Sequence, residues 1–232
     1  MDKISKDNLD NNVSAENQLE GGADVAYFGS SEPDFKITFV GNSITRHMPK
    51  PEELGWKLDC GMAASAPEKD YVHLCVSALE KKHGKVRCCI AQAAKWERDW
   101  TSGTILENLY SDAAAFAPDL LVVRIGENTK RELLADNDYE AAFDRMVKFF
   151  IGNSNAKVVI TGMFWRDERL ETAMKAVAEK RGYSFVSIED LGDRDDMKAI
   201  GLFEHYGVSI HPGDLGMKNI AERITEATDA LV

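Results

Sequence analysis

Three polar segments that lie far apart in the chain carry side chains suited to acyl transfer. Ser43 follows the apolar run 37–41, Asn128 stands in the segment "GEN" at 126–128, and His211 lies in "SIHPGDLGM". A serine hydroxyl attacks a carbonyl when a base takes its proton, and imidazole is the side chain suited to that step near neutral pH. The oxyanion that develops needs donors, which the Asn128 amide and the Ser43 N–H would supply.

The elements that must position these residues form an alternating pattern. Continuous β-branched and apolar runs are typical of parallel strands buried on both faces, and they occur at 36–40, 86–91, 119–125, 157–161 and 184–188. Amphipathic helical spacing fills the intervals, at 71–79, 139–150, 170–178 and 217–231. Strands that alternate with helices predict a doubly wound α/β sheet.

In such a sheet, ligands bind beyond the carboxyl ends of the strands, where loops and helix amino termini converge. Ser43, the segment 92–97, the segment 126–128 and Trp165 each follow one of the first four predicted strands. His211 precedes the last helix, after the fifth strand. We therefore expect one shared rim that holds the serine, the asparagine and the histidine.

Taken in order, "GNSIT", "GEN" and "HPGDLGM" resemble the nucleophile, third and last blocks of the SGNH or GDSL-type serine hydrolases, with Asn42 in the acidic position of the first block. The resemblance covers residues 36–232. It implies a flavodoxin-like three-layer α/β/α sandwich with a five-stranded parallel sheet, an ester hydrolase activity without a cofactor or metal, and catalytic roles for Ser43, His211 and Asn128. Residues 1–34 are expected to be a polar tail or surface wrap, and 35–232 the hydrolase domain.

Two positions depart from the family pattern. The catalytic acid normally lies three residues before the histidine, where this chain has Val208, and the second block, "IAQAAKWE", lacks the glycine whose N–H binds the oxyanion. Three outcomes are open: a backbone carbonyl orients His211, the chain is inactive, or a carboxylate from elsewhere takes the role. The candidate carboxylates are Glu204, Glu127 and Glu97. We favour a working Ser–His dyad with a substitute acceptor.

Aromatic residues near the expected rim point to the substrate. Trp56, Trp96 and Trp165 are candidate platforms for a sugar ring or an acyl group. Together with the resemblance they favour a short-chain ester of a carbohydrate, such as an acetylated sugar. The alternatives are an inactive carbohydrate-binding protein on the same fold and a thioesterase or acyltransferase that uses the same dyad. Taken alone, Ser43 would be read as a helix cap, and His205 competes weakly with His211 as the base.

Composition narrows the class of partner. Among 232 residues, 39 acidic side chains against 28 basic ones give a formal charge of −11, and no Lys/Arg block stands out. Nucleic acid is therefore excluded as a partner, and the expected ligand is a small-molecule or carbohydrate ester. The chain as given carries neither a signal peptide nor an apolar run of about 20 residues, so no membrane association and a cytoplasmic location are expected.

Overall fold

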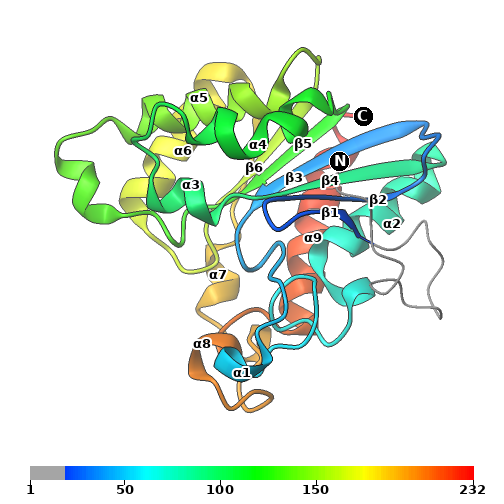
Figure 1. Ribbon diagram of the computed structural model, residues 1–232, viewed down its shortest axis with the longest axis vertical. Coiled ribbons are helices and arrows are strands. Elements are labelled where there is room, and N and C mark those ends of the chain that lie inside the picture. The colour runs from blue at the N-terminus through cyan, green and yellow to red at the C-terminus, as the bar shows by residue number, and fades with distance from the viewer. Residues whose placement is uncertain (1–18) are drawn as a thin grey trace.

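The computed structural model describes residues 19–232, which form one mixed sheet with helices on both faces (Figure 1). The sheet has the strand order β1-β2-β4-β3-β5-β6-β7. Its strands are β1 Glu20–Gly21, β2 Val25–Gly29, β3 Phe35–Gly41, β4 Val86–Gln92, β5 Leu120–Arg124, β6 Lys157–Thr161 and β7 Ser184–Val186. The five strands from β4 to β7 in that order are parallel, which confirms the predicted α/β architecture.

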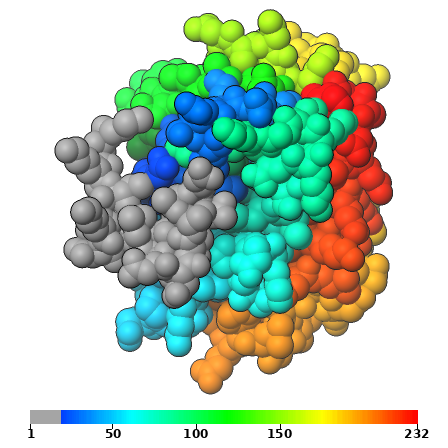
Figure 2. Space-filling model, turned by 90° about the vertical axis from the view of Figure 1, so that its right-hand side faces the viewer, coloured from blue at the N-terminus to red at the C-terminus, as the bar shows by residue number. Residues whose placement is uncertain are grey.

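The longer helices form the two outer layers. The helices α4 (Ile105–Ala115), α5 (Tyr139–Ile151) and α6 (Glu168–Arg181) cover one face, and α2 (Tyr71–His83) and α9 (Asp214–Asp229) cover the other. Figure 2 shows α2 beside α9 on the surface of that second layer. Shorter helical segments lie in the connections: α1 Pro51–Leu54, α3 Ala94–Arg98, α7 Glu189–Gly192, α8 Tyr206–Ser209, and the 3-10 turns η3 Pro67–Lys69, η4 Arg131–Ala135 and η5 Asp195–Met197.

Burial on both faces explains the continuous apolar runs in the sequence. In β3, Ile37 and Phe39 pack in the core under α2 and α9, whereas Val40 packs in the core under α4, α5 and α6. In β5, Val122 packs in the core under α2 and α9, and Val123 packs in the core under α4, α5 and α6. Burying a large aliphatic or aromatic side chain contributes roughly 1.5–3 kcal/mol, so a strand buried on two faces cannot carry the alternating polar residues of a half-exposed one.

The amino-terminal segment differs from the expectation. The predicted five-stranded sheet has seven strands, because β1 and β2 extend it beyond β4 in antiparallel pairing, so residues 20–29 belong to the sheet and are not a tail. β1 has only two residues, and the short strand "VAYFG" at 25–29 is followed by β3 with no helix between them, so neither fits the strand–helix alternation that predicted the sheet. Of the rest of the expected tail or surface wrap, residues 1–18 lie outside the described residues.

None of the helices in residues 19–232 combines the length and the apolar character needed to cross a lipid bilayer.

Candidate active site

Three strands end at the same level and set the floor of the site. Gly41, the last residue of β3, pairs with Gln92 at the end of β4 and with Arg124 at the end of β5. A side chain on Gly41 would collide with the Thr45 side chain and the Arg124 carbonyl oxygen, so glycine permits the close turn that follows. That turn presents Asn42 downward into the protein and Ser43 upward to the surface.

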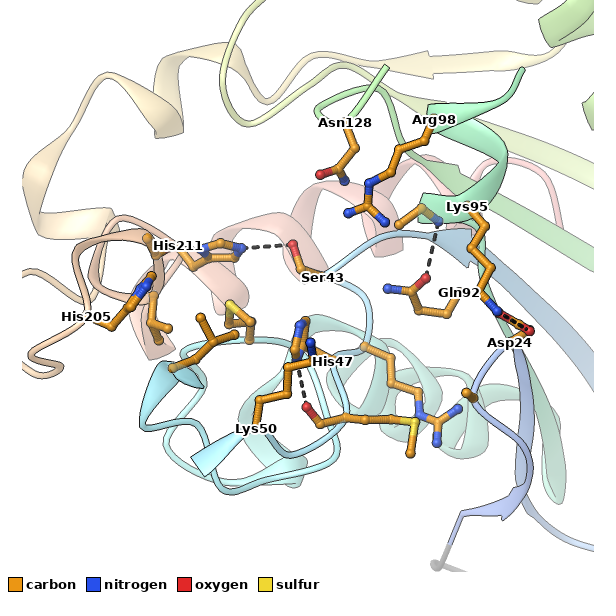
Figure 3. Close-up of a pocket in the computed structure, with 18 residues that line it drawn as sticks. Asp24, Ser43, His47, Lys50, Gln92, Lys95, Arg98, Asn128, His205 and His211 are labelled. Carbon is orange, nitrogen blue, oxygen red and sulfur yellow. Dashed lines mark hydrogen bonds and ion pairs between the residues drawn. The ribbon is translucent and has the colours of Figure 1, made fainter. Parts of the chain in front are cut away.

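Ser43 and His211 meet above this floor. Ser43 Oγ lies 2.8 Å from His211 Nε2, and both residues line a cleft of about 440 Å³ (Figure 3). The indole of Trp165 packs edge-on against the imidazole, with ring centroids 4.9 Å apart at an interplanar angle of 81°. His211 is largely buried, and α8 and the start of α9 flank it in the chain. The fold thus brings the predicted nucleophile and the predicted base into hydrogen-bonding contact.

The other ring nitrogen of His211 contacts a backbone oxygen. His211 Nδ1 lies 2.6 Å from the carbonyl oxygen of Gly207 in α8. A carbonyl oxygen only accepts, so Nδ1 carries the proton and the neutral ring leaves Nε2 free to accept from the serine hydroxyl. Burial, and secondarily the positive charge of Arg124, lower the pKa of His211 to about 4 despite this hydrogen bond. The imidazole is therefore neutral at neutral pH, the form a base requires.

None of the three candidate carboxylates contacts His211. Glu204 is exposed and forms no side-chain hydrogen bond or ion pair within residues 19–232, while Glu97 and Glu127 lie buried below the serine and bond to other groups. Of the open alternatives, the structure contains the backbone carbonyl. Val208, at the position of the family's acid, is fully buried in the core beside the cleft.

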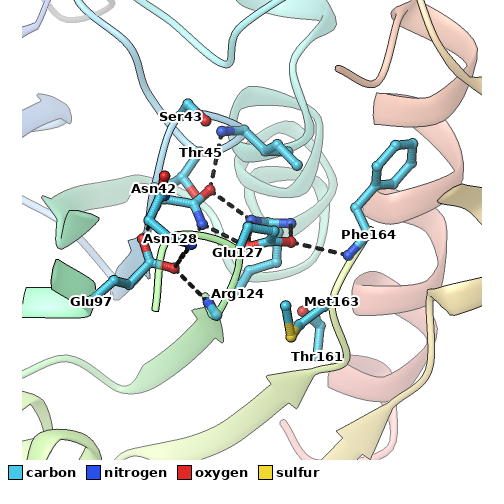
Figure 4. Close-up of polar contacts among 12 residues, drawn as sticks. Asn42, Ser43, Thr45, Glu97, Arg124, Glu127, Asn128, Thr161, Met163 and Phe164 are labelled. Carbon is cyan, nitrogen blue, oxygen red and sulfur yellow. Dashed lines mark hydrogen bonds and ion pairs between the residues drawn. The ribbon is translucent and has the colours of Figure 1, made fainter. Parts of the chain in front are cut away.

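Glu97 fixes the "GEN" segment from below. Its Oε1 accepts hydrogen bonds from the backbone N–H of Gly126 at 2.7 Å and of Asn128 at 3.1 Å, and its Oε2 accepts from Asn128 Nδ2 at 2.7 Å (Figure 4). The Asn128 amide thereby keeps its second N–H proton for another acceptor, and Asn128 lines the same cleft as Ser43. Burial, together with the nearby charge of Glu127, raises the pKa of Glu97.

Asn42 joins the two glutamates to a buried arginine. Its Nδ2 donates to Glu97 Oε1 at 3.1 Å and to Glu127 Oε2 at 2.6 Å, and its Oδ1 accepts from Arg124 Nη2 at 2.7 Å. Arg124 also binds Glu127 through both terminal nitrogens, at 2.8 and 2.7 Å. Although burial opposes ionisation, Arg124 lowers the pKa of Glu127. The serine therefore stands on a buried, paired network rather than on an apolar core.

Two of the three candidate aromatic platforms are in the wrong place for a ligand. Trp56 and Trp96 are fully buried in the two cores, and Trp56 donates its indole N–H to the carbonyl of His47. Trp56 lies in a long loop and Trp96 in the short helix α3, and both indoles point into the protein. Burying an indole in a core is favourable because its large apolar surface leaves water. Trp165 is only half-buried and lies against His211, so its contact with substrate stays a prediction.

Several residues of the site were missed in the sequence. Gly207 acts through its carbonyl, which no residue type signals. Arg124 did carry a signal, because an arginine at the end of the buried run "LLVVR" needs a buried partner. The cleft is also lined by basic side chains, among them Lys95 and Arg98 of the segment "KWER", and His205 lies on its rim without contacting Ser43.

Within residues 19–232, no group of three or more histidines, cysteines or carboxylates is arranged to hold a metal ion.

Comparison with known proteins shows similarity in fold. No family model matches the sequence, and no curated protein sequence matches it. A solved carbohydrate esterase, whose active site displays divergent catalytic and non-catalytic binding functions, superposes with a TM-score of 0.54 at 13% identity, over 87% of this chain and 66% of that one.

Two further structures match to a similar degree. A two-domain esterase active on acetylated mannans, co-crystallised with mannopentaose, has a TM-score of 0.52 at 15% identity, over 85% of this chain and 50% of that one. A family two carbohydrate esterase from Cellvibrio japonicus has a TM-score of 0.52 at 17% identity, over 86% and 63%. The chain thus spans between half and two thirds of these structures. It shares the fold of these carbohydrate esterases, which agrees with the α/β fold predicted from the sequence.

Proposed function

We propose that the protein is a serine esterase that hydrolyses a short-chain acyl ester of a carbohydrate, with Ser43 as nucleophile and His211 as base. The observation that carries the proposal is the 2.8 Å contact between Ser43 Oγ and His211 Nε2 on the wall of an open cleft. A serine that only capped a helix would have no reason to meet an imidazole whose other nitrogen is fixed. The esterase class is also supported by the fold shared with carbohydrate esterases.

The proposed reaction has two balanced halves. His211 Nε2 takes the proton of Ser43 Oγ as the oxygen bonds to the acyl carbon, and the same proton passes to the alcohol oxygen when the ester C–O bond breaks. Water then attacks the acyl-serine, gives a proton to Nε2, and the acid leaves as Ser43 regains its proton. One ester and one water yield one acid and one alcohol, without a cofactor.

Two donors would stabilise the oxyanion in this proposal. The Ser43 N–H has no acceptor within residues 19–232, and the Asn128 amide retains one N–H beside its bond to Glu97. Ala94 lines the cleft where the family's second-block glycine is missing, and its N–H donates to the Gln92 side chain at 3.2 Å. That N–H is therefore already bound, and the donors we assign to the oxyanion are the Ser43 N–H and the Asn128 amide. Losing one donor of this kind costs roughly 3 kcal/mol in other acyl-transfer enzymes.

The test is the hydrolysis of 4-nitrophenyl acetate and of an acetylated mannose oligosaccharide by the wild type and by Ser43→Ala. Ser111→Ala, which removes an exposed hydroxyl from α4, is the matched control. We expect Ser43→Ala to reduce kcat/KM by about 10³-fold or more and the control to match the wild type. Equal rates for wild type and Ser43→Ala would refute the proposal, and sugar binding without turnover would then identify a binding protein on the hydrolase fold. Acyl-CoA turnover that exceeds ester turnover would instead indicate a thioesterase.

A further inference from the structure

The cleft beside Ser43 is basic although the protein as a whole is acidic. Four basic side chains line it, Arg46, Lys50, Lys95 and Arg98, and among residues 19–232 the only lining carboxylate is Asp24. This is the reverse of the overall balance, which is −11. Fields of one sign in a cleft attract ligands of the other sign and raise their local concentration.

Three of these cations are already neutralised. The pairs are Arg46–Asp59 at 2.7 Å, Lys50–Glu53 at 3.0 Å and Lys95–Asp24 at 2.8 Å. Arg98 is different, because its guanidinium forms no ion pair and no hydrogen bond with any residue from 19 to 232. It is therefore the lining cation whose charge and donors are available to a ligand.

Arg98 is directed at the reacting centre rather than away from the protein. It is the last residue of α3, and Figure 3 shows its side chain extending into the cleft, toward Ser43 and Asn128. Its charge also reaches His47 on the opposite wall, where burial, Lys50 and Arg98 together lower the imidazole pKa. Arg98 is exposed, so its guanidinium is accessible to a ligand that enters the cleft.

We propose that Arg98 forms a subsite for a carboxylate carried by the substrate, so that the natural ester is an anion. This inference rests on the proposed esterase function and names its substrate class. The planar guanidinium presents paired N–H donors that match a carboxylate in a bidentate arrangement, and such charge-assisted bonds are about twice as strong as neutral ones. The carboxylate belongs either to the alcohol part, as in an acidic sugar, or to the acyl part, as in the half-ester of a dicarboxylic acid.

Two matched pairs of chromogenic esters separate these sources. On the alcohol side, 3-carboxy-4-nitrophenyl acetate is compared with 4-nitrophenyl acetate. On the acyl side, mono(4-nitrophenyl) adipate is compared with 4-nitrophenyl hexanoate, which has the same chain length without the charge. The measured quantity is the ratio of kcat/KM for the anionic ester to that for its neutral partner.

The variants are Arg98→Gln, Arg98→Lys and Arg145→Gln. Arg145 is exposed on α5 and does not line the cleft, so its substitution changes the net charge by the same amount. We expect the ratio for one of the two pairs to fall about tenfold or more in Arg98→Gln, to recover in part in Arg98→Lys, and to stay at the wild-type value in Arg145→Gln. The pair that responds identifies the part of the ester that carries the carboxylate.

A binding measurement keeps this inference separate from the proposed function. The two anionic esters are titrated calorimetrically into Ser43→Ala and into Ser43→Ala/Arg98→Gln, neither of which needs to turn them over. Weaker binding of an anionic ester by about tenfold in the double variant supports the subsite even if the wild type hydrolyses nothing. Equal binding by both proteins, or an unchanged anionic-to-neutral ratio in Arg98→Gln, would overturn it.

Discussion

His211 is held by the carbonyl oxygen of Gly207, four residues earlier in the chain, at 2.6 Å from Nδ1. In the proposed mechanism, this contact stands where a catalytic triad has a carboxylate. A carbonyl acceptor selects the tautomer that leaves Nε2 free, but it does not supply a negative charge to stabilise the imidazolium that forms during the reaction. As the proposed base, His211 would therefore be oriented by its neighbour but weak.

The pH dependence of activity should report that weakness. Burial lowers the pKa of His211 to about 4, and only the neutral ring accepts the serine proton. Activity is therefore fully present above this pKa and is lost as the pH falls through about 4, well below the 6.5 of an unperturbed histidine. We expect kcat/KM for 4-nitrophenyl acetate to be constant between pH 6 and pH 8, with circular dichroism checking that the protein stays folded at the acid end. An acid limb with its midpoint between pH 6 and pH 7 would contradict the neutral, desolvated imidazole.

Restoring a carboxylate at position 208 should change that profile. Val208 lies three residues before His211 and lines the same cleft, so Val208→Asp places a negative charge beside the ring. An opposite charge favours the imidazolium, and we expect the acid limb to move upward by about one pH unit or more. Val208→Asn is the control, because it adds polarity at the same size without charge. Both variants lose stability, since Val208 is fully buried; a limb that moves equally in both would mean that the charge does not reach His211.

Glu97 should behave as a positioning residue for Asn128. The carboxylate receives both the backbone N–H and the side-chain Nδ2 of Asn128, whereas the amide of Glu97→Gln would turn a donor toward one of them. We expect Glu97→Gln to lower kcat by about 10-fold to 10²-fold with little change in KM, because the oxyanion donor acts only in the transition state.

A double-mutant cycle with Asn128→Ala separates positioning from general destabilisation. If Glu97 acts through Asn128, Glu97→Gln should cost much less activity in the Asn128→Ala background than in the wild type. Additive losses of kcat in the double variant would show that the two residues act independently.

The fold and the site were predictable to different degrees, for physical reasons. The five parallel strands are buried on both faces and alternate with helices, so they are visible in the sequence, whereas β1 has two residues and β2 lies outside that alternation. Ser43, Asn128 and His211 follow strand ends or precede a helix, where topology alone gathers them. The acceptor for His211 is a main-chain atom, which residue type does not reveal. The burial of Trp56 and Trp96 depends on how the folded chain packs around them, so the sequence alone did not show it.

Arg124 should carry much of the stability of the site. It is fully buried and pairs with Glu127 through two hydrogen bonds, so Arg124→Met would leave a buried carboxylate without its counter-charge. Breaking a buried pair from one side costs roughly 3–5 kcal/mol. We expect a loss of that size in urea unfolding. Arg181→Met breaks an exposed pair with Asp144 and should cost far less; equal losses would mean that the Arg124 pair is no more important than a surface contact.

The hydrogen bonds of Asn42 with Glu97, Glu127 and Arg124 explain why "GNSIT" has an asparagine before the serine. The variant Asn42→Asp tests this explanation. Asn42 Nδ2 donates to Glu97 and to Glu127, so an aspartate would remove both donors and add a third carboxylate between them. We expect a loss of about 3–5 kcal/mol in the free energy of unfolding at pH 7. Arg124 at Oδ1 offsets only one of the two neighbouring carboxylates, so we expect the pKa of the new aspartate to lie above its unfolded value. The destabilisation is then complete above that raised pKa and shrinks as the pH falls toward 4. Urea unfolding between pH 7 and pH 5 measures the difference, with Asn137→Asp, at an exposed position, as the control. A stability loss no larger than the control's would mean that the amide of Asn42 is not what holds the two glutamates together beneath Ser43.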